Sequence, residues 1–111
     1  MNRTVNDQVP AVVREALEAA NAHETSRFLG CFAGDGAVDD WGRVFTGHAQ
    51  VRRWSDAEFI GKNVTLSDLS FATSGDGVAV QARVGGDGYT GPSTFMFTVH
   101  GGKIRVMRIT A

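Results

Sequence analysis

The residues of this sequence best suited to chemistry are two adjacent carboxylates, Asp39 and Asp40. They end a short stretch, residues 37–40, that predicts an extended segment before a turn at residues 41–43. Successive side chains of a strand point to opposite faces, so one carboxylate should meet solvent and the other should face the interior. A carboxylate among apolar side chains loses hydration and becomes a stronger proton acceptor. The inward member of the pair is therefore a candidate general base. For Asp40 the alternative is a structural acid paired with Arg43 across the turn.

Aromatic side chains surround this acidic pair in the sequence, and with Arg43 they form the predicted ligand-binding set. They could build a wall around a flat hydrophobic ligand, or they could simply belong to the core. Trp54 is the strongest ligand-binding candidate, because tryptophan is seldom fully buried. The aromatic members of the set are Trp41, Phe45, Trp54 and Phe59.

Metal and cofactor chemistry has little support in the sequence. His23, His48 and His100 are scattered, without paired spacing and without a cysteine partner, so we expect no metal site. Cys31 lies among apolar residues and is interpreted as a buried small hydrophobe. We expect no cofactor, because no nucleophile elbow or phosphate-binding glycine pattern is present, and the glycine-rich residues 85–91 form a connection.

The bulk composition indicates one domain, residues 1–111, with an ordinary share of apolar and charged residues (42% and 21%). A net charge of −1 argues against a general nucleic-acid or membrane-surface binder. A single cysteine cannot form an internal disulfide, and no apolar run approaches the length of a membrane span. No signal-like leader opens the sequence, and we expect a cytoplasmic protein.

Three helical segments are predicted in the first half of the chain. An apolar stripe at helical spacing marks the first one, with Asp7 as a plausible N-cap and Pro10 tolerated in the first turn. The second helix should carry Phe28, Leu29 and Phe32 inward and end at residues 34–36. Gly47 opens the third helix, on which Val51, Trp54 and Glu58 share one face. The stripe of the first helix comprises Val9, Val12, Val13, Ala16, Leu17 and Ala20.

The rest of the chain predicts strands. The apolar alternation slips by one residue near Ser67 and Asp68, which indicates a β-bulge. Residues 75–77 form a hairpin turn signal, and residues 78–84 then alternate strictly. A further strand carries Phe95, Phe97 and Val99, and residues 100–102 turn the chain into a last strand over 103–110. Helices followed by strands imply an α+β fold, in which a curved antiparallel sheet wraps around the helices to form an open cone.

The outer face of this sheet should be covered by a second molecule. Thr94, Met96 and Thr98 face away from the phenylalanine side of their strand, and the predicted helices cannot cover both faces. We therefore expect a homodimer through the sheet.

The order of elements resembles the NTF2-like superfamily, whose cone is also described as cystatin-like. Residues 32–59 are similar to its SnoaL-like and ketosteroid-isomerase-like branches. The resemblance is carried by Phe-Ala-Gly-Asp-Gly-Ala-Val-Asp-Asp-Trp at 32–41, by Gly47, by the helix over 51–54 and by Lys-Ile-Arg-Val-Met-Arg at 103–108. It implies the cone fold, a pocket for a small hydrophobic ligand and, by position, Asp40 as the general base.

The sequence departs from that isomerase pattern at the oxyanion hole. The resemblance implies a tyrosine on the first helix and an acid on a late strand, but the first position falls on Ala16. No Asp or Glu follows Asp87, and the single tyrosine, Tyr89, lies in the glycine-rich connection. Three functions remain open: a small isomerase or cyclase acting through Asp40, a ligand-binding module without chemistry, and an interaction protein with a vestigial pocket.

Overall fold

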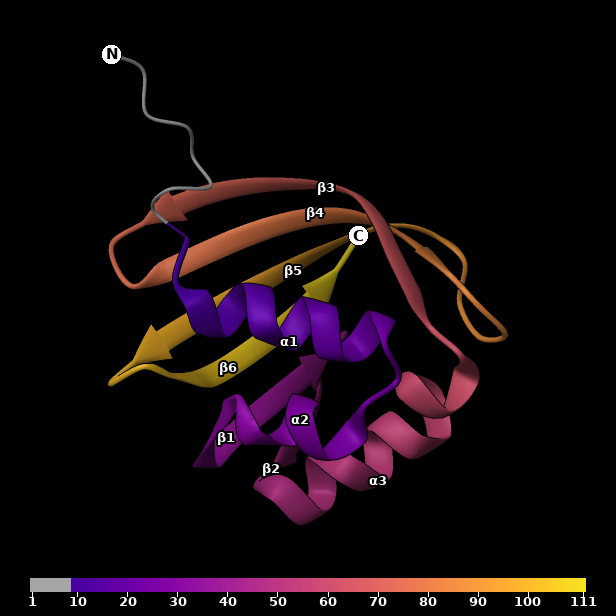
Figure 1. Cartoon of the computed structure of the whole chain (residues 1–111), viewed down its shortest axis with the longest axis horizontal. Helices are drawn as coiled ribbons and strands as arrows, with labels where there is room; N and C mark the ends of the chain where they lie inside the picture. Colours follow the sequence, from indigo (N-terminus) through magenta and orange to yellow (C-terminus); the bar gives the residue numbers. More distant parts are fainter. Residues whose placement is uncertain (1–8) are drawn as a thin grey trace.

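The computed structural model describes residues 9–111, which fold into one curved sheet with helices gathered on its inner side (Figure 1). In sheet order the strands are β2-β1-β6-β5-β4-β3. None of the helices in the described range is long and apolar enough to cross a membrane. The elements are α1 (Ala11–Asn21), α2 (Thr25–Gly30), β1 (Phe32–Asp40), β2 (Arg43–Thr46), α3 (His48–Glu58), the 3-10 turn η2 (Ile60–Lys62), β3 (Thr65–Ser74), β4 (Gly77–Gly85), β5 (Gly91–His100) and β6 (Lys103–Thr110).

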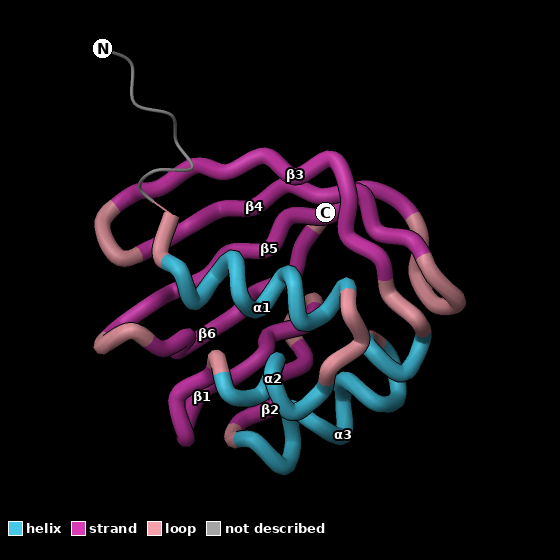
Figure 2. The backbone as a smooth tube through the Cα atoms, viewed as in Figure 1, coloured by secondary structure: helices cyan, strands magenta, loops and turns pink. Residues whose placement is uncertain are grey.

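Strands β3 to β6 form an antiparallel meander, as the sequence predicts (Figure 2). The expected bulge is present, because the β3–β4 register shifts between Ser67 and Ser70. Asp68 adopts a positive φ of 53° there, which a short polar residue tolerates better than a branched one. Leu69, beside the bulge, is exposed, while Phe71 packs against the core.

The sheet is mixed, where the sequence predicted antiparallel pairing throughout. β1 pairs with β2 in an antiparallel hairpin but runs parallel to β6, with Val38 opposite Met107. A parallel neighbour requires a long crossover instead of a tight turn, and here most of the chain lies between the two strands. Successive side chains point to opposite faces of a strand in either pairing, so the apolar alternation seen here does not indicate whether two strands run parallel or antiparallel.

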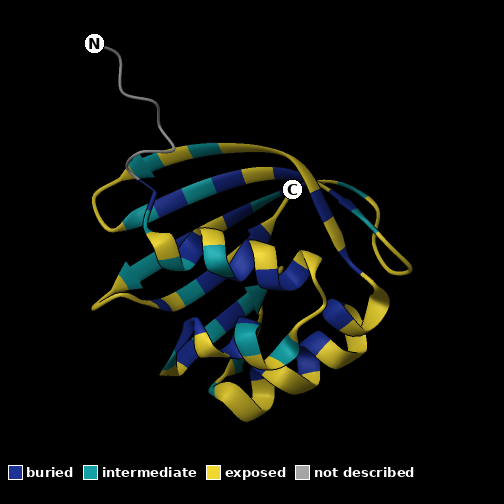
Figure 3. Cartoon of the chain, in the orientation of Figure 1, coloured by how far each residue is buried: buried dark blue, intermediate teal, exposed yellow. Residues whose placement is uncertain are grey.

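The first helix packs its predicted stripe against the inner face of the sheet (Figure 3). Val13, Ala16, Leu17 and Ala20 are buried, and Val12 is half-buried. The helix begins at Ala11, after Pro10, whose fixed φ suits a residue that precedes a first turn. The proposed N-cap Asp7 lies outside the described residues.

The second helix ends earlier than predicted, and the next strand begins where the sequence predicted helix. α2 ends at Gly30, and β1 starts at Phe32. This strand runs through Gly34 and Gly36, where the sequence predicted the end of the helix. Tertiary pairing explains the difference, because the backbone N–H of Ile104 donates to the Cys31 carbonyl at 2.9 Å. A Cβ at Gly36 would come within 2.8 Å of the Ile104 carbonyl oxygen, so this glycine permits the close approach of β6. Phe32 still points inward, from a strand instead of a helix.

Candidate functional site

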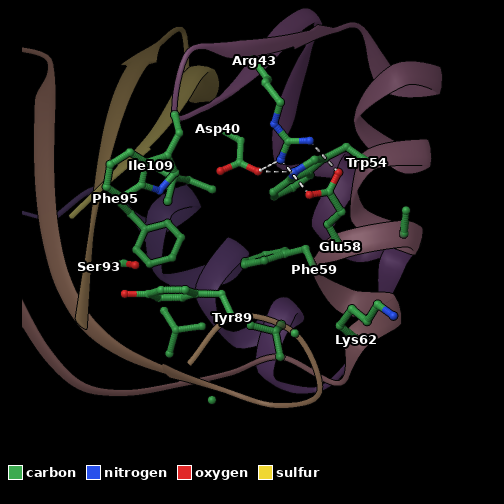
Figure 4. Close-up of a pocket in the computed structure, with 16 residues that line it drawn as sticks. Asp40, Arg43, Trp54, Glu58, Phe59, Lys62, Tyr89, Ser93, Phe95 and Ile109 are labelled. Atoms are coloured by element: carbon green, nitrogen blue, oxygen red, sulfur yellow. Dashed lines mark hydrogen bonds and ion pairs between the residues drawn. The ribbon is translucent and has the colours of Figure 1, made fainter. Parts of the chain in front are cut away.

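A cavity of about 410 Å³ opens between α3, the inner face of the sheet and the loop that joins β4 to β5 (Figure 4). Its volume lies within the range of small-molecule sites. Apolar side chains form most of the wall, while a few polar groups from β1, β2, α3 and β5 converge on it. The apolar side chains that line it are Trp41, Trp54, Ala57, Phe59, Val64, Val84, Phe95 and Ile109.

Asp40 faces this cavity because it shares the inward phase of β1 with buried Val38. Asp39 points to the other face, where Oδ1 accepts a hydrogen bond from the Gly42 backbone N–H at 2.8 Å and Oδ2 lies 3.5 Å from Arg108 Nε. The Asp40 side chain is also the less exposed of the two, at 15% against 21%. The structure therefore confirms that the two side chains point to opposite faces, as strand alternation predicts, and that Asp40 is the inward one, as the resemblance implies.

The two oxygens of Asp40 have different surroundings. Oδ2 accepts hydrogen bonds from Arg43 Nη2 at 2.5 Å and from the indole Nε1–H of Trp54 at 3.0 Å. Oδ1 has no hydrogen-bond partner among the described residues, and in Figure 4 it is the oxygen turned away from these donors, on the side of Ile109 and Phe95. One oxygen is thus fixed by two donors, and the other remains free to accept from a ligand.

Arg43 joins Asp40 to a second acid, Glu58, at the end of α3. Its Nη1 and Nη2 donate to the two Glu58 oxygens at 3.0 and 2.7 Å, in the bidentate geometry that suits a guanidinium. Hydrogen bonding to Arg43 lowers the pKa of Glu58 against a smaller opposing effect of burial, and the same pairing raises the pKa of Arg43. The pairing of Asp40 with Arg43 proposed from sequence is therefore present, but it occurs inside a three-residue cluster.

The predicted aromatic wall is only partly assembled at the cavity. Trp54 and Phe59 are stacked at 4.9 Å with an interplanar angle of 23°, and both are buried. Trp41 reaches the rim from the β1–β2 turn and is 61% exposed. Phe45 does not line the cavity, because it packs behind Trp54 at 6.3 Å and lies under the Arg43 guanidinium at 5.7 Å. Asp40, Trp41, Arg43, Trp54 and Phe59 therefore come together, and Phe45 supports them from behind.

Potential metal ligands do not converge in the described part of the chain. No group of three or more His, Cys, Asp or Glu side chains in residues 9–111 is placed to hold a metal ion. His23 and His48 instead contact the backbone carbonyls of Val64 and Phe32 at 2.8 and 3.0 Å. Cys31 is buried, as expected, and burial raises the pKa of its thiol.

A family model, the SnoaL-like domain, matches residues 13–107 of this sequence. The chain belongs to the SnoaL-like family. The resemblance carried by residues 32–59 and by the last strand is therefore confirmed. No curated protein matches the sequence.

Solved structures place this SnoaL-like chain within the NTF2-like fold. A candidate polyketide cyclase from Sinorhizobium meliloti superimposes with a TM-score of 0.85 at 26% identity, over 97% of this chain and 100% of its own. A Catenulispora acidiphila protein with a ketosteroid isomerase-like fold, solved with trimethylamine, reaches 0.78 at 23% identity, over 93% and 86%. A Mycobacterium tuberculosis protein solved with estradiol-17beta-hemisuccinate reaches 0.74 at 18% identity, over 91% of each chain. At these last two identities the likeness concerns the fold alone.

Sequence reasoning missed four polar groups of this SnoaL-like cavity: Glu58 as the partner of Arg43, Lys62, Tyr89 and Ser93. Tyr89 comes from the glycine-rich loop and is fixed by a hydrogen bond from its hydroxyl to the Pro92 carbonyl at 2.8 Å. Nothing local in the sequence indicates that this ring would return to the cavity. Ser93 did leave a signal, because it is a polar residue in the same inward phase as Phe95.

Proposed function

We propose that this protein binds a small, largely apolar carbonyl compound in the cavity, and that Asp40 acts on it as a general base of the isomerase or cyclase kind. The observation that supports this proposal is the Asp40 carboxylate itself: Oδ2 is fixed by two donors, while Oδ1 faces an apolar cavity without a partner among the described residues. A poorly hydrated oxygen held in one orientation is suited to accept a proton from a carbon acid.

The reaction would transfer one proton and one electron pair. Oδ1 takes the proton from the carbon next to the carbonyl group, and the electrons of the broken C–H bond move onto the carbonyl oxygen as an enolate. The protonated Asp40 then returns the proton to a carbon of the same compound, which completes an isomerisation without a co-reactant. Arg43 and Trp54 keep Oδ2 in place during both steps, so the carboxylate does not rotate away from its substrate.

A binding module without chemistry is the second candidate, and one observation favours it. The indole N–H of Trp54 donates to Asp40, and the Tyr89 hydroxyl donates to a backbone carbonyl, so neither is free to stabilise an enolate oxygen. Ala16, at the position where the resemblance implies a tyrosine, is buried and has no donor on its side chain. Losing one oxyanion donor typically costs about a hundred- to a thousandfold in rate.

The ligands of the structural neighbours are consistent with either candidate. The estradiol derivative and the trimethylamine belong to those proteins, and a designed binder of 17-OHP also has this fold, at a TM-score of 0.77 and 17% identity. They support a small molecule in the cone of this chain, and they leave its identity open.

Proton exchange from a simple aromatic ketone separates the two candidates. Acetylnaphthalene has an enolisable methyl group. NMR in heavy water follows the exchange of the methyl hydrogens for deuterium, and a separate titration measures binding. We expect exchange by the wild type, a loss of about a hundredfold or more in Asp40→Asn, and no change in the matched control Asp39→Asn. Binding without exchange would favour the binding module. Absence of binding would contradict both candidates.

The same reasoning predicts poor isomerisation of a β,γ-unsaturated steroid ketone, because the donors that contact Asp40, Arg43 and Trp54, already donate to carboxylates, and the indole of Trp41 at the rim is 61% exposed. Efficient turnover by the wild type would show that the residues matched to the oxyanion-hole positions are the wrong ones. Weak turnover that Asp40→Asn abolishes would support Asp40 as the base for a different substrate.

We also propose that two copies associate through the outer face of the sheet. Met96, on β5, is 43% exposed on this face. Val44, on the edge strand β2, is 59% exposed. The described helices lie on the inner side of the sheet (Figure 3), and no described helix buries Met96 or Val44. Light scattering should give twice the monomer mass, and Met96→Glu should shift the protein toward monomer. A monomer at high micromolar concentration would contradict this assembly.

A further inference from the structure

The cavity also contains a buried polar side chain that the proposed reaction does not use. Ser93 lies on β5 in the inward phase shared with Phe95 and Phe97, and it is only 4% exposed. Figure 4 shows it on the sheet side of the cavity, near the rings of Phe95 and Tyr89. A polar residue in an otherwise apolar row is unusual, because burying a hydroxyl is unfavourable unless it finds a hydrogen bond.

The Ser93 hydroxyl has no hydrogen-bond partner among residues 9–111. No fully buried side-chain nitrogen or oxygen in that range lacks a partner, so Oγ of this serine must reach the open space of the cavity. More than nine-tenths of the residue is buried, and the small exposed remainder is directed at the site. The serine is therefore placed to bond with whatever occupies the cavity.

The sheet register places Ser93 far from Asp40 on the same inner face. Asp40 lies opposite Ile109, and Ile109 lies opposite Phe95, so two strand spacings separate the acid from Phe95. Ser93 is two residues further along β5. With strands roughly 4.8 Å apart and a rise of about 3.3 Å per residue, the Cα atoms of Asp40 and Ser93 are about 12 Å apart. This span is too long for both groups to act on one carbonyl and its neighbouring carbon.

We propose that Ser93 is a ligand anchor, which donates a hydrogen bond to an oxygen at the end of the ligand remote from Asp40. This inference rests on the proposed function and narrows its ligand class. The ligand is a rigid, mostly apolar ring compound with a polar group at each end. Allowing for both side chains and for one hydrogen bond at each end, those groups are roughly 6–9 Å apart. The apolar walls between them, among them Phe59, Phe95 and Ile109, contact the rings.

Two other side chains at the cavity could in principle donate to that remote oxygen. The Tyr89 hydroxyl already donates to the Pro92 carbonyl at 2.8 Å, and the residue is 57% exposed. Lys62 lines the mouth and is exposed, so its ammonium group remains hydrated. Ser93 differs from both because it is buried and has no other partner.

A pair of matched probes tests this anchor. The first is an acetylnaphthol, with its hydroxyl and acetyl groups at opposite ends of the fused rings, and the second is the corresponding ethylnaphthol, which has nearly the same shape but no carbonyl oxygen. Affinities are measured by fluorescence titration for the wild type, Ser93→Ala, Ser93→Thr and Ser93→Val. The last two variants have the same shape and differ only in the hydroxyl, so they separate hydrogen bonding from packing. Circular dichroism checks that each variant is folded.

We expect the wild type and Ser93→Thr to prefer the acetyl probe by about two- to tenfold, the range for one net hydrogen bond. Ser93→Ala and Ser93→Val should bind both probes alike. If the wild type binds both probes equally, or if Ser93→Ala retains the preference, the anchor is refuted while ligand binding in the cavity stands. If the wild type binds neither probe, both the anchor and the proposed function are refuted.

Discussion

Replacing Trp54 by phenylalanine tests whether the indole–carboxylate hydrogen bond holds Asp40 in place. Trp54 is 3% exposed, its Nε1–H donates to Asp40 Oδ2 at 3.0 Å, and its ring stacks on Phe59 at 4.9 Å. Phenylalanine keeps an aromatic ring in the stack but removes the donor. The substitution therefore isolates one polar contact within a mostly apolar site.

The expected cost has two parts. A hydrogen bond to a charged group contributes about 1.5–3 kcal/mol to the free energy of unfolding. The indole also has about two more buried carbons than a phenyl ring, which adds roughly 1.5 kcal/mol at about 0.8 kcal/mol for each buried methylene. We expect Trp54→Phe to lose about 3–4.5 kcal/mol and its Tm to fall by roughly 12–18 °C, at about 4 °C per kcal/mol for a chain of this size.

A double-mutant cycle separates these two parts. Urea unfolding, followed by far-ultraviolet circular dichroism, is measured for Trp54→Phe in the wild type and in an Asp40→Ala background. Without the carboxylate the substitution should cost only the packing part, which gives a coupling energy of about 1.5 kcal/mol or more. Asp39→Ala is the control background, and there the two effects should add. An equal cost of Trp54→Phe with and without Asp40 would refute the role of this bond.

Three further predictions concern charge, backbone space and the thiol. Glu58 has a pKa below its usual 4.5, so its pairing with Arg43 adds stability above that pH and loses it as the pH falls through the lowered value. Arg43→Gln should flatten this part of the acid-unfolding profile, measured by circular dichroism from neutral pH downward. A Cβ at Gly61 would lie 1.7 Å from the Asp56 carbonyl oxygen, so Gly61→Ala should cost about 3 kcal/mol or more in urea unfolding. Gly30→Ala is its control, since no atom lies within 4 Å of a Cβ there. Burial raises the pKa of the Cys31 thiol, so alkylation by iodoacetamide should be slow in the native state and should follow unfolding in urea.

Each of these predictions has an outcome that would contradict it. An unchanged acid profile in Arg43→Gln would mean that the ion pair is screened by solvent, as exposed pairs often are. Equal stability of Gly61→Ala and Gly30→Ala would mean that the 3-10 turn adjusts to the added methyl group. Rapid alkylation of Cys31 in the native state would mean that the end of α2 opens locally.

Local sequence patterns were enough to predict most of the strands and the opposite directions of the two acids. The bulge near Ser67 follows from a slip in alternation that the backbone must accommodate. The inward turn of Asp40 follows from the two-residue period of a strand and from the match to a known family. These features depend on contacts between neighbours in the chain, so the order of residues is sufficient to indicate them.

Contacts between residues far apart in the sequence were decided by the tertiary structure. The glycines at 34 and 36 looked like a helix end, but pairing with β6 draws them into β1, since only glycine leaves room for the Ile104 carbonyl at position 36. Arg43 meets Glu58 only because α3 packs beside the β1–β2 hairpin. Ser93 becomes part of the site only because the curved sheet brings β5 and β1 to the same cavity. Spacing along the chain does not indicate such contacts, because they depend on how the helices pack against the curved sheet and enclose the cavity.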